Sequence, residues 1–136
     1  MAYWLLKTEP DTYSFSDLVS ERKTTWNGIR NFQARNHLRK MKPGDKALIY
    51  HTGDEKAVVG IAEVVSEPYL EPSNDSAEWT QVDIKPIEPL QKKVLLSELR
   101  QNKDLANLIL LKQARLSVMP VEKDDFSRIV KLGKSS

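Results

Sequence analysis

The chain has 136 residues, of which 40% are hydrophobic and 29% are charged, and its formal net charge is +2 at pH 7. This composition excludes wholesale disorder, and the length predicts one domain over residues 1–136. The chain has no cysteine and two histidines, so we expect no disulfide, no thiolate chemistry and no metal site. Apolar runs are short and no leader pattern opens the chain. We therefore expect no membrane association, no cofactor, a cytoplasmic location and a monomer.

The first third of the chain alternates short strands and short helices. Ser14 and Asp17 have the spacing of a capping box, which marks a helix start. Ala34, Leu38 and Met41 form an apolar stripe at helical spacing. The elements predicted here are a strand over residues 3–7, a helix over 14–22, a loop over 24–30, a helix over 31–41 and a type II turn over 42–45.

Strands dominate the following segments. Gly53-Asp54 separates two apolar runs and predicts a hairpin, whereas Gly60 in mid-strand predicts a bulge or a close approach by another group. Between residues 79 and 87 the alternation places Val82 and Ile84 inside, and Gln81, Asp83 and Lys85 outside. The predicted elements are strands over 46–51 and 57–65, an acidic loop over 67–78, a strand over 79–87, a helix over 97–101 capped by Ser97, a segment over 105–111 open between helix and strand, a strand over 115–119 that ends at Pro120, and a helix over 122–132.

Short strands among short helices define an α+β class. The pattern predicts a small, mainly antiparallel β-barrel with helices packed around it. Because hairpins connect the central strands, we do not expect parallel strands joined by helices.

Charge is unevenly distributed along the chain. Residues 22–44 contain seven Lys or Arg and no acid, whereas residues 54–89 contain nine acids and two lysines. Such separation creates a local positive field that attracts phosphates. The alternative is a solvated helix face together with an acidic surface loop. The candidate phosphate-binding residues are Arg30, Arg35, Arg39 and Lys42.

Aromatic residues share this bias, since seven of ten precede residue 52. Aromatic faces interleaved with cations are typical of base-stacking sites. Trp4 and Phe15 are predicted to belong to the core. Trp26 differs, because it lies in the polar stretch Thr-Thr-Trp-Asn-Gly-Ile-Arg-Asn, and we predict that it contacts a ligand.

Several segments together resemble the EVE domain family. They are Tyr3 to Pro10 with Tyr13-Ser14-Phe15, Trp26 to Asn36, Tyr50-His51, Val59 to Val64 and Arg115 to Val121. Because the chain starts directly at the domain, it resembles the stand-alone bacterial type. The resemblance implies a PUA-like fold related to YTH and ASCH domains. It also implies binding of nucleic acid, DNA or RNA, with a modified base such as methylated or hydroxymethylated cytosine held in a pocket.

The first functional hypothesis is therefore a non-enzymatic reader of a modified base. Trp26 forms one wall of the pocket and Tyr50 is a candidate second wall, while Ile29 and Val118 are candidates for a methyl niche. The candidate ligand-binding residues are Lys7, Ser14, Trp26, Asn27, Gly28, Ile29, Arg30, Asn31, Gln33, Tyr50, His51 and Ser117.

Several of these residues have structural alternatives. Asn31 at the start of a helix is a candidate cap, and Arg30 is equally suited to anchoring a loop carbonyl. His51 at a strand end is typical of a structural histidine, and Tyr50 is typical of a core residue.

Two other function classes stay open. An ASCH-like amidohydrolase acting on an acylated nucleoside would use Lys7, Glu9 and either Thr24 or Thr25, with the lysine pKa lowered by burial. A protein-interaction module would use the acidic loop over residues 67–78. The reader hypothesis assigns no catalytic residue.

Overall fold

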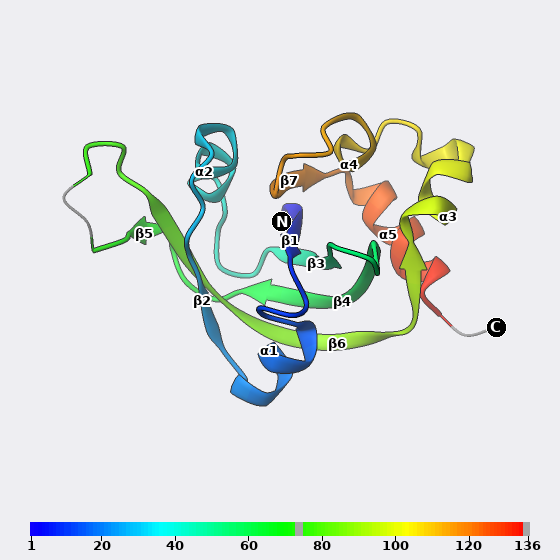
Figure 1. Cartoon of the computed structure of the whole chain (residues 1–136), viewed down its shortest axis with the longest axis horizontal. Helices are drawn as coiled ribbons and strands as arrows, with labels where there is room; N and C mark the ends of the chain where they lie inside the picture. The colour runs from blue at the N-terminus through cyan, green and yellow to red at the C-terminus, as the bar shows by residue number, and fades with distance from the viewer. Residues whose placement is uncertain (73–74, 135–136) are drawn as a thin grey trace.

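A curled mixed sheet forms the frame of the molecule, and short helices cover its ends (Figure 1). The computed structural model describes residues 1–72 and 75–134. The strands are β1 (Tyr3–Thr8), β2 (Thr24–Trp26), β3 (Lys46–His51), β4 (Ala57–Val64), β5 (Tyr69–Leu70), β6 (Thr80–Leu95) and β7 (Val118–Val121). The helices are α1 (Phe15–Glu21), α2 (Phe32–Leu38), α3 (Leu96–Gln101), the 3-10 helix η1 (Lys103–Leu105), α4 (Ile109–Lys112) and α5 (Lys123–Leu132).

The strands follow the spatial order β2-β6-β4-β3-β1-β7, and β5 pairs with β6. Every neighbouring pair is antiparallel except β1 and β3, which run parallel from Tyr3 opposite Lys46 to Thr8 opposite His51. The mainly antiparallel sheet is confirmed. The expectation of no parallel pair joined by helices is wrong, because α1, β2 and α2 connect β1 to β3.

Most predicted elements are present, with differences at their ends. Ser14 caps α1 in a capping box with Asp17, and Asn31 caps α2. The predicted loop over residues 24–30 is wrong at its start, because β2 pairs with β6 there. Its three residues are too few to produce a recognisable alternation. The loop over 67–78 contains β5, and residues 73–74 of it lie outside the described part of the chain.

The second half shows larger differences. Pro120 does not end β7 but lies within it, which an edge strand tolerates because the missing N–H faces no neighbour. Gln81, expected outside, is buried on β6. Leu95, and not Ser97, is the N-cap of α3, and the Glu98 carboxylate accepts the Leu95 backbone N–H at 3.2 Å. The ambiguous segment over 105–111 is helical in part and contains no strand, because residue 105 ends η1 and residues 109–111 belong to α4.

The core packs around one close approach. Trp4 and Phe15 are buried as predicted. A Cβ added to Gly60 would lie 2.5 Å from the Phe15 ring, so only glycine lets β4 pass under this ring. The prediction of a close approach at Gly60 is confirmed.

A buried carboxylate anchors the beginning of the chain. Asp45 is the last residue of the predicted type II turn, in which Gly44 has φ +96° and the Asp45 N–H donates to the Lys42 carbonyl at 3.0 Å. Its carboxylate accepts hydrogen bonds from Ala2 N, Lys42 N and Trp4 Nε1 at 3.0 to 3.1 Å. Asp45 thereby ties β1 to the start of β3. None of the helices within residues 1–72 and 75–134 has the length and apolarity to span a membrane.

Candidate functional site

A cavity of about 420 Å³ lies between α1 and β2, beside Trp26. This volume falls within the range of small-molecule pockets, roughly 300–1,000 Å³. Trp26 is a core residue, 8% exposed, and still lines the cavity. The sequence analysis set Trp26 apart from the core residues Trp4 and Phe15, whereas the structure shows that it belongs to the core and also borders a hollow. The other lining residues are Thr8, Thr12, Tyr13, Glu21, Thr24, Thr25 and Asn27.

The indole N–H groups distinguish Trp26 from the other two tryptophans. Trp4 Nε1 donates to Asp45 at 3.0 Å, and Trp79 Nε1 donates to Asp75 at 2.9 Å. Trp26 Nε1 has no hydrogen-bond partner among the residues that the structure describes. Nε1 of Trp26 is not among the buried side-chain atoms that lack a partner, so this N–H is accessible and available to an acceptor that enters the cavity.

Tyr13 forms the aromatic edge of the same cavity, and the sequence analysis did not assign it to the site. Its ring meets Trp26 edge-on, with centroids 6.2 Å apart and planes at 77°. Burial, and then a hydrogen bond to the Glu21 carboxylate, raises the pKa of Tyr13 to about 12. The phenol is therefore protonated at neutral pH. Its position beside the motif residues Ser14 and Phe15 was the available clue.

The three arginines of the predicted basic patch contact the segment that was predicted to be an acidic loop. Arg30 forms a two-pronged ion pair with Glu71, with both N–O distances 3.0 Å. Arg35 donates to the Ala77 carbonyl, and Arg39 contacts Glu78 at 3.3 Å. The basic and acidic segments thus neutralise each other in part. Lys42 stands apart, at the turn before β3.

Aromatic rings complete this contact. Arg30 lies 5.1 Å from the Trp79 ring, Trp79 stacks on Phe32 at 5.1 Å, and Arg35 lies 4.9 Å from Phe32. Two guanidinium groups therefore enclose two stacked rings, an arrangement favoured by cation–π attraction. It fixes the segment after β5 against α2.

Acid should loosen this contact. The hydrogen bond from Arg30 lowers the pKa of Glu71 below its ordinary 4.5. The ionised carboxylate therefore stabilises the fold fully above pH 4.5, and this stabilisation is lost as the pH falls through the lowered pKa. Glu71→Gln is expected to lower the melting temperature at neutral pH and to flatten its decline in acid. Thermal melts across the acid range check this, and an unchanged acid limb in the variant would contradict it.

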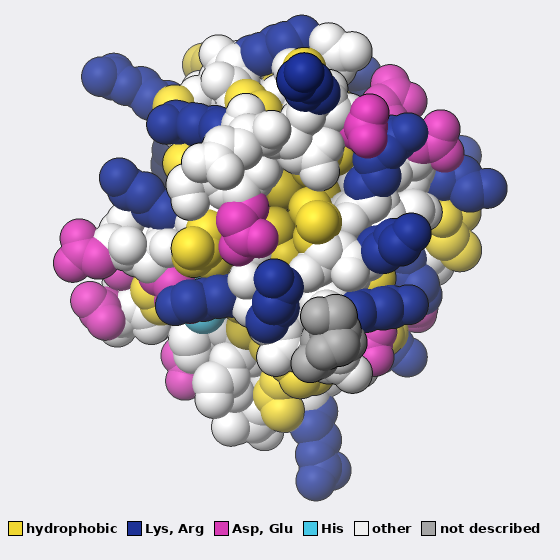
Figure 2. All heavy atoms as spheres, turned by 90° about the vertical axis from the view of Figure 1, so that its right-hand side faces the viewer, with side chains coloured by type: hydrophobic (Ala, Val, Ile, Leu, Met, Phe, Trp, Pro, Cys, Tyr) yellow, Lys and Arg dark blue, Asp and Glu magenta, His cyan; other side chains and the backbone are white. Residues whose placement is uncertain are grey.

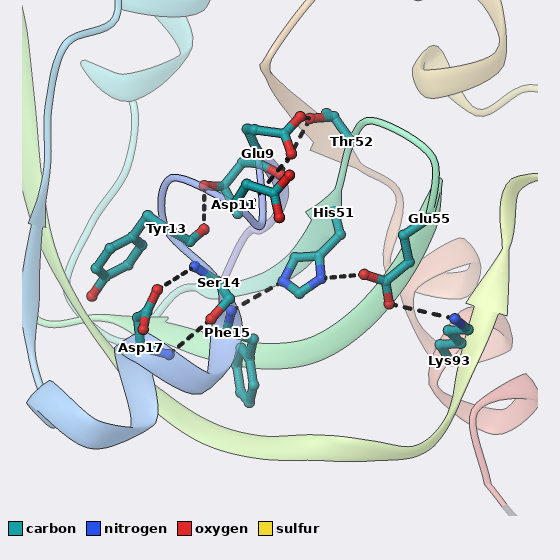
Figure 3. Close-up of polar contacts among 11 residues, drawn as sticks. Glu9, Asp11, Tyr13, Ser14, Phe15, Asp17, His51, Thr52, Glu55 and Lys93 are labelled. Atoms are coloured by element: carbon teal, nitrogen blue, oxygen red, sulfur yellow. Dashed lines mark hydrogen bonds and ion pairs between the residues drawn. The ribbon is translucent and has the colours of Figure 1, made fainter.

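His51 is fully engaged within the fold. Figure 3 shows its ring between the Phe15 amide and the Glu55 carboxylate. Nε2 accepts from Phe15 N at 3.0 Å, so Nδ1 carries the proton and donates to Glu55 at 2.8 Å. This histidine orients the start of α1, in agreement with the alternative that His51 is a structural histidine. Ser14 is occupied as the α1 cap.

The other predicted ligand-binding residues divide among separate places. Asn27 lines the Trp26 cavity, while the Gly28 N–H donates to Glu71 at 3.1 Å. Asn31 and Gln33 border another hollow with residues 113–116. Ile29 packs against the core, and the Ser117 carbonyl accepts the Lys7 N–H.

Tyr50 and Lys7 line a different cavity from Trp26. Tyr50 is buried, which raises its pKa, and the structure does not bring it to the Trp26 cavity as a second wall. The amidohydrolase set is likewise divided, because Lys7 and Thr25 line separate cavities. Burial lowers the pKa of Lys7, and its Nζ donates to the Ala114 carbonyl at 2.7 Å.

Comparison with known proteins places these features in a family. The curled mixed sheet with its short helices is a PUA-like fold. The family model of the EVE domain matches residues 2–132, and the chain belongs to the EVE domain family. Human thymocyte nuclear protein 1 is 30% identical over 165 residues, which cover 96% of this chain and 73% of the relative.

Solved structures agree with this assignment. A protein of Rhodopseudomonas palustris has a TM-score of 0.92 at 38% identity, covering 98% of this chain and 93% of that one. Human thymocyte nuclear protein 1 in complex with DNA containing 5-methylcytosine has a TM-score of 0.92 at 28% identity, covering 100% and 99%. An ASCH protein of Zymomonas mobilis has a TM-score of 0.64 at 15% identity, covering 97% of this chain and 99% of that one, and shares the fold alone.

Proposed function

We propose that this protein binds nucleic acid carrying a modified cytosine and holds the modified base in the Trp26 cavity. The observation that carries the proposal is the partnerless indole N–H of a buried tryptophan lining a cavity of about 420 Å³. The complex of human thymocyte nuclear protein 1 with DNA containing 5-methylcytosine supports the choice of base.

The lining of the cavity suits a pyrimidine. Trp26 and Tyr13 offer aromatic surface, and stacking of one base is worth about 1–3 kcal/mol. The Trp26 N–H serves a base acceptor, and the Asn27 side-chain amide offers both a donor and an acceptor. Threonine methyl groups supply apolar contact for a substituent on the ring. The base has to leave its stack to enter, at a cost of a few kcal/mol, which favours single strands or weakened pairs.

Asn27 gives a test that leaves the core intact, because the side chain is exposed. Asn27→Ala is expected to weaken binding to a 5-methylcytosine oligonucleotide by about three- to tenfold, the loss of one hydrogen bond. Fluorescence anisotropy with matched methylated, hydroxymethylated and unmodified strands measures the effect. DNA and RNA versions of each strand decide which nucleic acid is bound.

Asn107→Ala is the matched control, because Asn107 is an exposed asparagine outside the cavity. It should bind like the wild type. If the wild-type protein binds methylated and unmodified strands equally and Asn27→Ala changes neither, the proposed reading of the base is wrong. A cytoplasmic location is part of the proposal and is checked by fractionation.

A further inference from the structure

A second cavity, of about 240 Å³, lies at the same end of β1 and is lined by three cations. Lys7 comes from β1, Lys56 from the residue before β4, and Arg100 from α3. Among the described residues none of the three forms an ion pair. In this they differ from Arg30 and Arg39, whose charges are compensated by Glu71 and Glu78.

Tyr50 adds a neutral donor to this cluster. The residue is 4% exposed and lines the cavity, and its hydroxyl has no hydrogen-bond partner within the described residues. The Lys7 ammonium lies 5.7 Å from the centre of its ring. Three uncompensated cations and a phenol O–H form a set of donors suited to an oxyanion.

The sheet geometry relates this cavity to the first one. Lys7 pairs with Tyr50 and Thr8 pairs with His51 across the parallel strands β1 and β3. Successive side chains of a strand point to opposite faces, so Lys7 and Thr8 open toward different cavities. The two cavities therefore flank the end of β1. Any strand that occupied both cavities would have to cross this end.

The backbone at Lys56 supports a ligand role. Lys56 has φ +46°, a left-handed conformation that glycine adopts without strain and lysine does not. Its carbonyl accepts the Leu96 N–H at 2.8 Å, which fixes the turn against α3. A charged side chain is thus held at a position where glycine would fit the fold better.

Lysine and arginine side chains are numerous on the α3 and α5 side of the molecule. Figure 2 shows them around a hydrophobic centre on this face, with acidic side chains among them. Glu55, which precedes the lining residue Lys56 in the chain, is paired with His51 and Lys93. The Glu9 carboxylate accepts from Thr52 Oγ1 at 3.3 Å (Figure 3), and Thr52 lines the second cavity, so Glu9 lies at the rim of that cavity.

We infer that Lys7, Lys56, Arg100 and Tyr50 form the phosphate site of this protein and hold a phosphodiester next to the nucleotide whose base occupies the Trp26 cavity. The inference rests on the proposed function and moves the phosphate contacts away from Arg30, Arg35 and Arg39. It also assigns Glu9 an opposing role, because a carboxylate on the rim repels the backbone that crosses it.

The experiment measures the salt dependence of binding to a short single strand containing one 5-methylcytosine. Lys56→Gly and Arg100→Gln are each expected to weaken binding severalfold at low salt and to reduce the slope of log K against log salt by about 0.7. Lys56→Gly should do so without lowering the melting temperature. Glu9→Gln should strengthen binding. Lys131→Gln, which removes an exposed charge from α5, is the control.

The free nucleoside 5-methyl-2′-deoxycytidine separates the two proposals, because it carries no phosphate. Its affinity should be the same in the wild type, Lys56→Gly and Arg100→Gln, and inorganic phosphate should compete with the oligonucleotide only. If the oligonucleotide binds but both variants have the slope of Lys131→Gln, the phosphate site is refuted while the proposed function stands. If the wild type binds neither oligonucleotide nor nucleoside, the proposed function fails first.

Discussion

Trp26→Ala is expected to lose both binding of the modified strand and much of the stability of the fold. The side chain is 8% exposed and packs in the core, opposite Val82 of β6. Removing a buried tryptophan side chain costs about 3–5 kcal/mol, and loss of base stacking weakens binding by about tenfold or more. Denaturant titration and anisotropy measure the two effects, with binding measured at a temperature at which the variant is folded.

Trp26→Phe separates these effects. Phenylalanine keeps an aromatic ring against Tyr13 and the core but has no N–H. We expect a smaller loss of stability than for alanine and a loss of affinity of about fivefold, from one missing hydrogen bond. If Trp26→Phe binds methylated strands as tightly as the wild type does, the indole N–H has no role in recognition.

The second large effect is expected at Asp45, which precedes β3 and lies at the opposite end of the β1–β3 pair from both cavities. Asp45→Ala leaves the Trp4 indole N–H buried without an acceptor and also deprives the amides of Ala2 and Lys42 of their partner. An unsatisfied buried donor costs about 1–3 kcal/mol, so the variant should lose about 3 kcal/mol of unfolding free energy. Urea denaturation followed by tryptophan fluorescence measures the loss.

Asp45→Asn refines this test. Oδ2 of Asp45 accepts from both Trp4 and Lys42, whereas Oδ1 accepts from Ala2. An asparagine oxygen at the Oδ2 position keeps two of the three bonds, so its stability should lie between those of the alanine variant and the wild type. Asp104→Ala, an exposed carboxylate in η1, should change stability by less than about 0.5 kcal/mol. Equal losses for Asp45→Ala and Asp104→Ala would contradict the anchoring role.

The fold was predictable wherever local chemistry determines it. The capping box at Ser14 and the turn at Gly44 depend on residues adjacent in the sequence. The close approach at Gly60 was predictable because glycine has no side chain. The parallel pairing of β1 with β3 was not predictable, because strand order depends on contacts distant in sequence. β2 was missed for the same reason, since its three residues are a strand only through pairing with β6.

The site was predictable in part. Sequence reasoning found Trp26 and Asn27, which line one cavity, and Lys7 and Tyr50, which line the other. The sequence analysis placed all four residues in one pocket, because the sequence of a strand does not show which cavity each of its faces borders. The cluster of cations from Arg22 to Lys42 predicted a phosphate site. The structure shows that Glu71 and Glu78 pair with two of its arginines, Arg30 and Arg39. Lys56 and Arg100 are single cations in their segments and gave no pattern.

The insertion of β1 between β3 and β7 has a consequence for how the chain reaches this structure during synthesis. Leu6 pairs with Val118, more than a hundred positions further along the chain, so one side of β1 has no partner until β7 has been synthesised. Pairings that distant are slow to form, and an unpaired strand side invites association with other chains. Nascent chains stalled before β7 are therefore the species that chaperones need to shield.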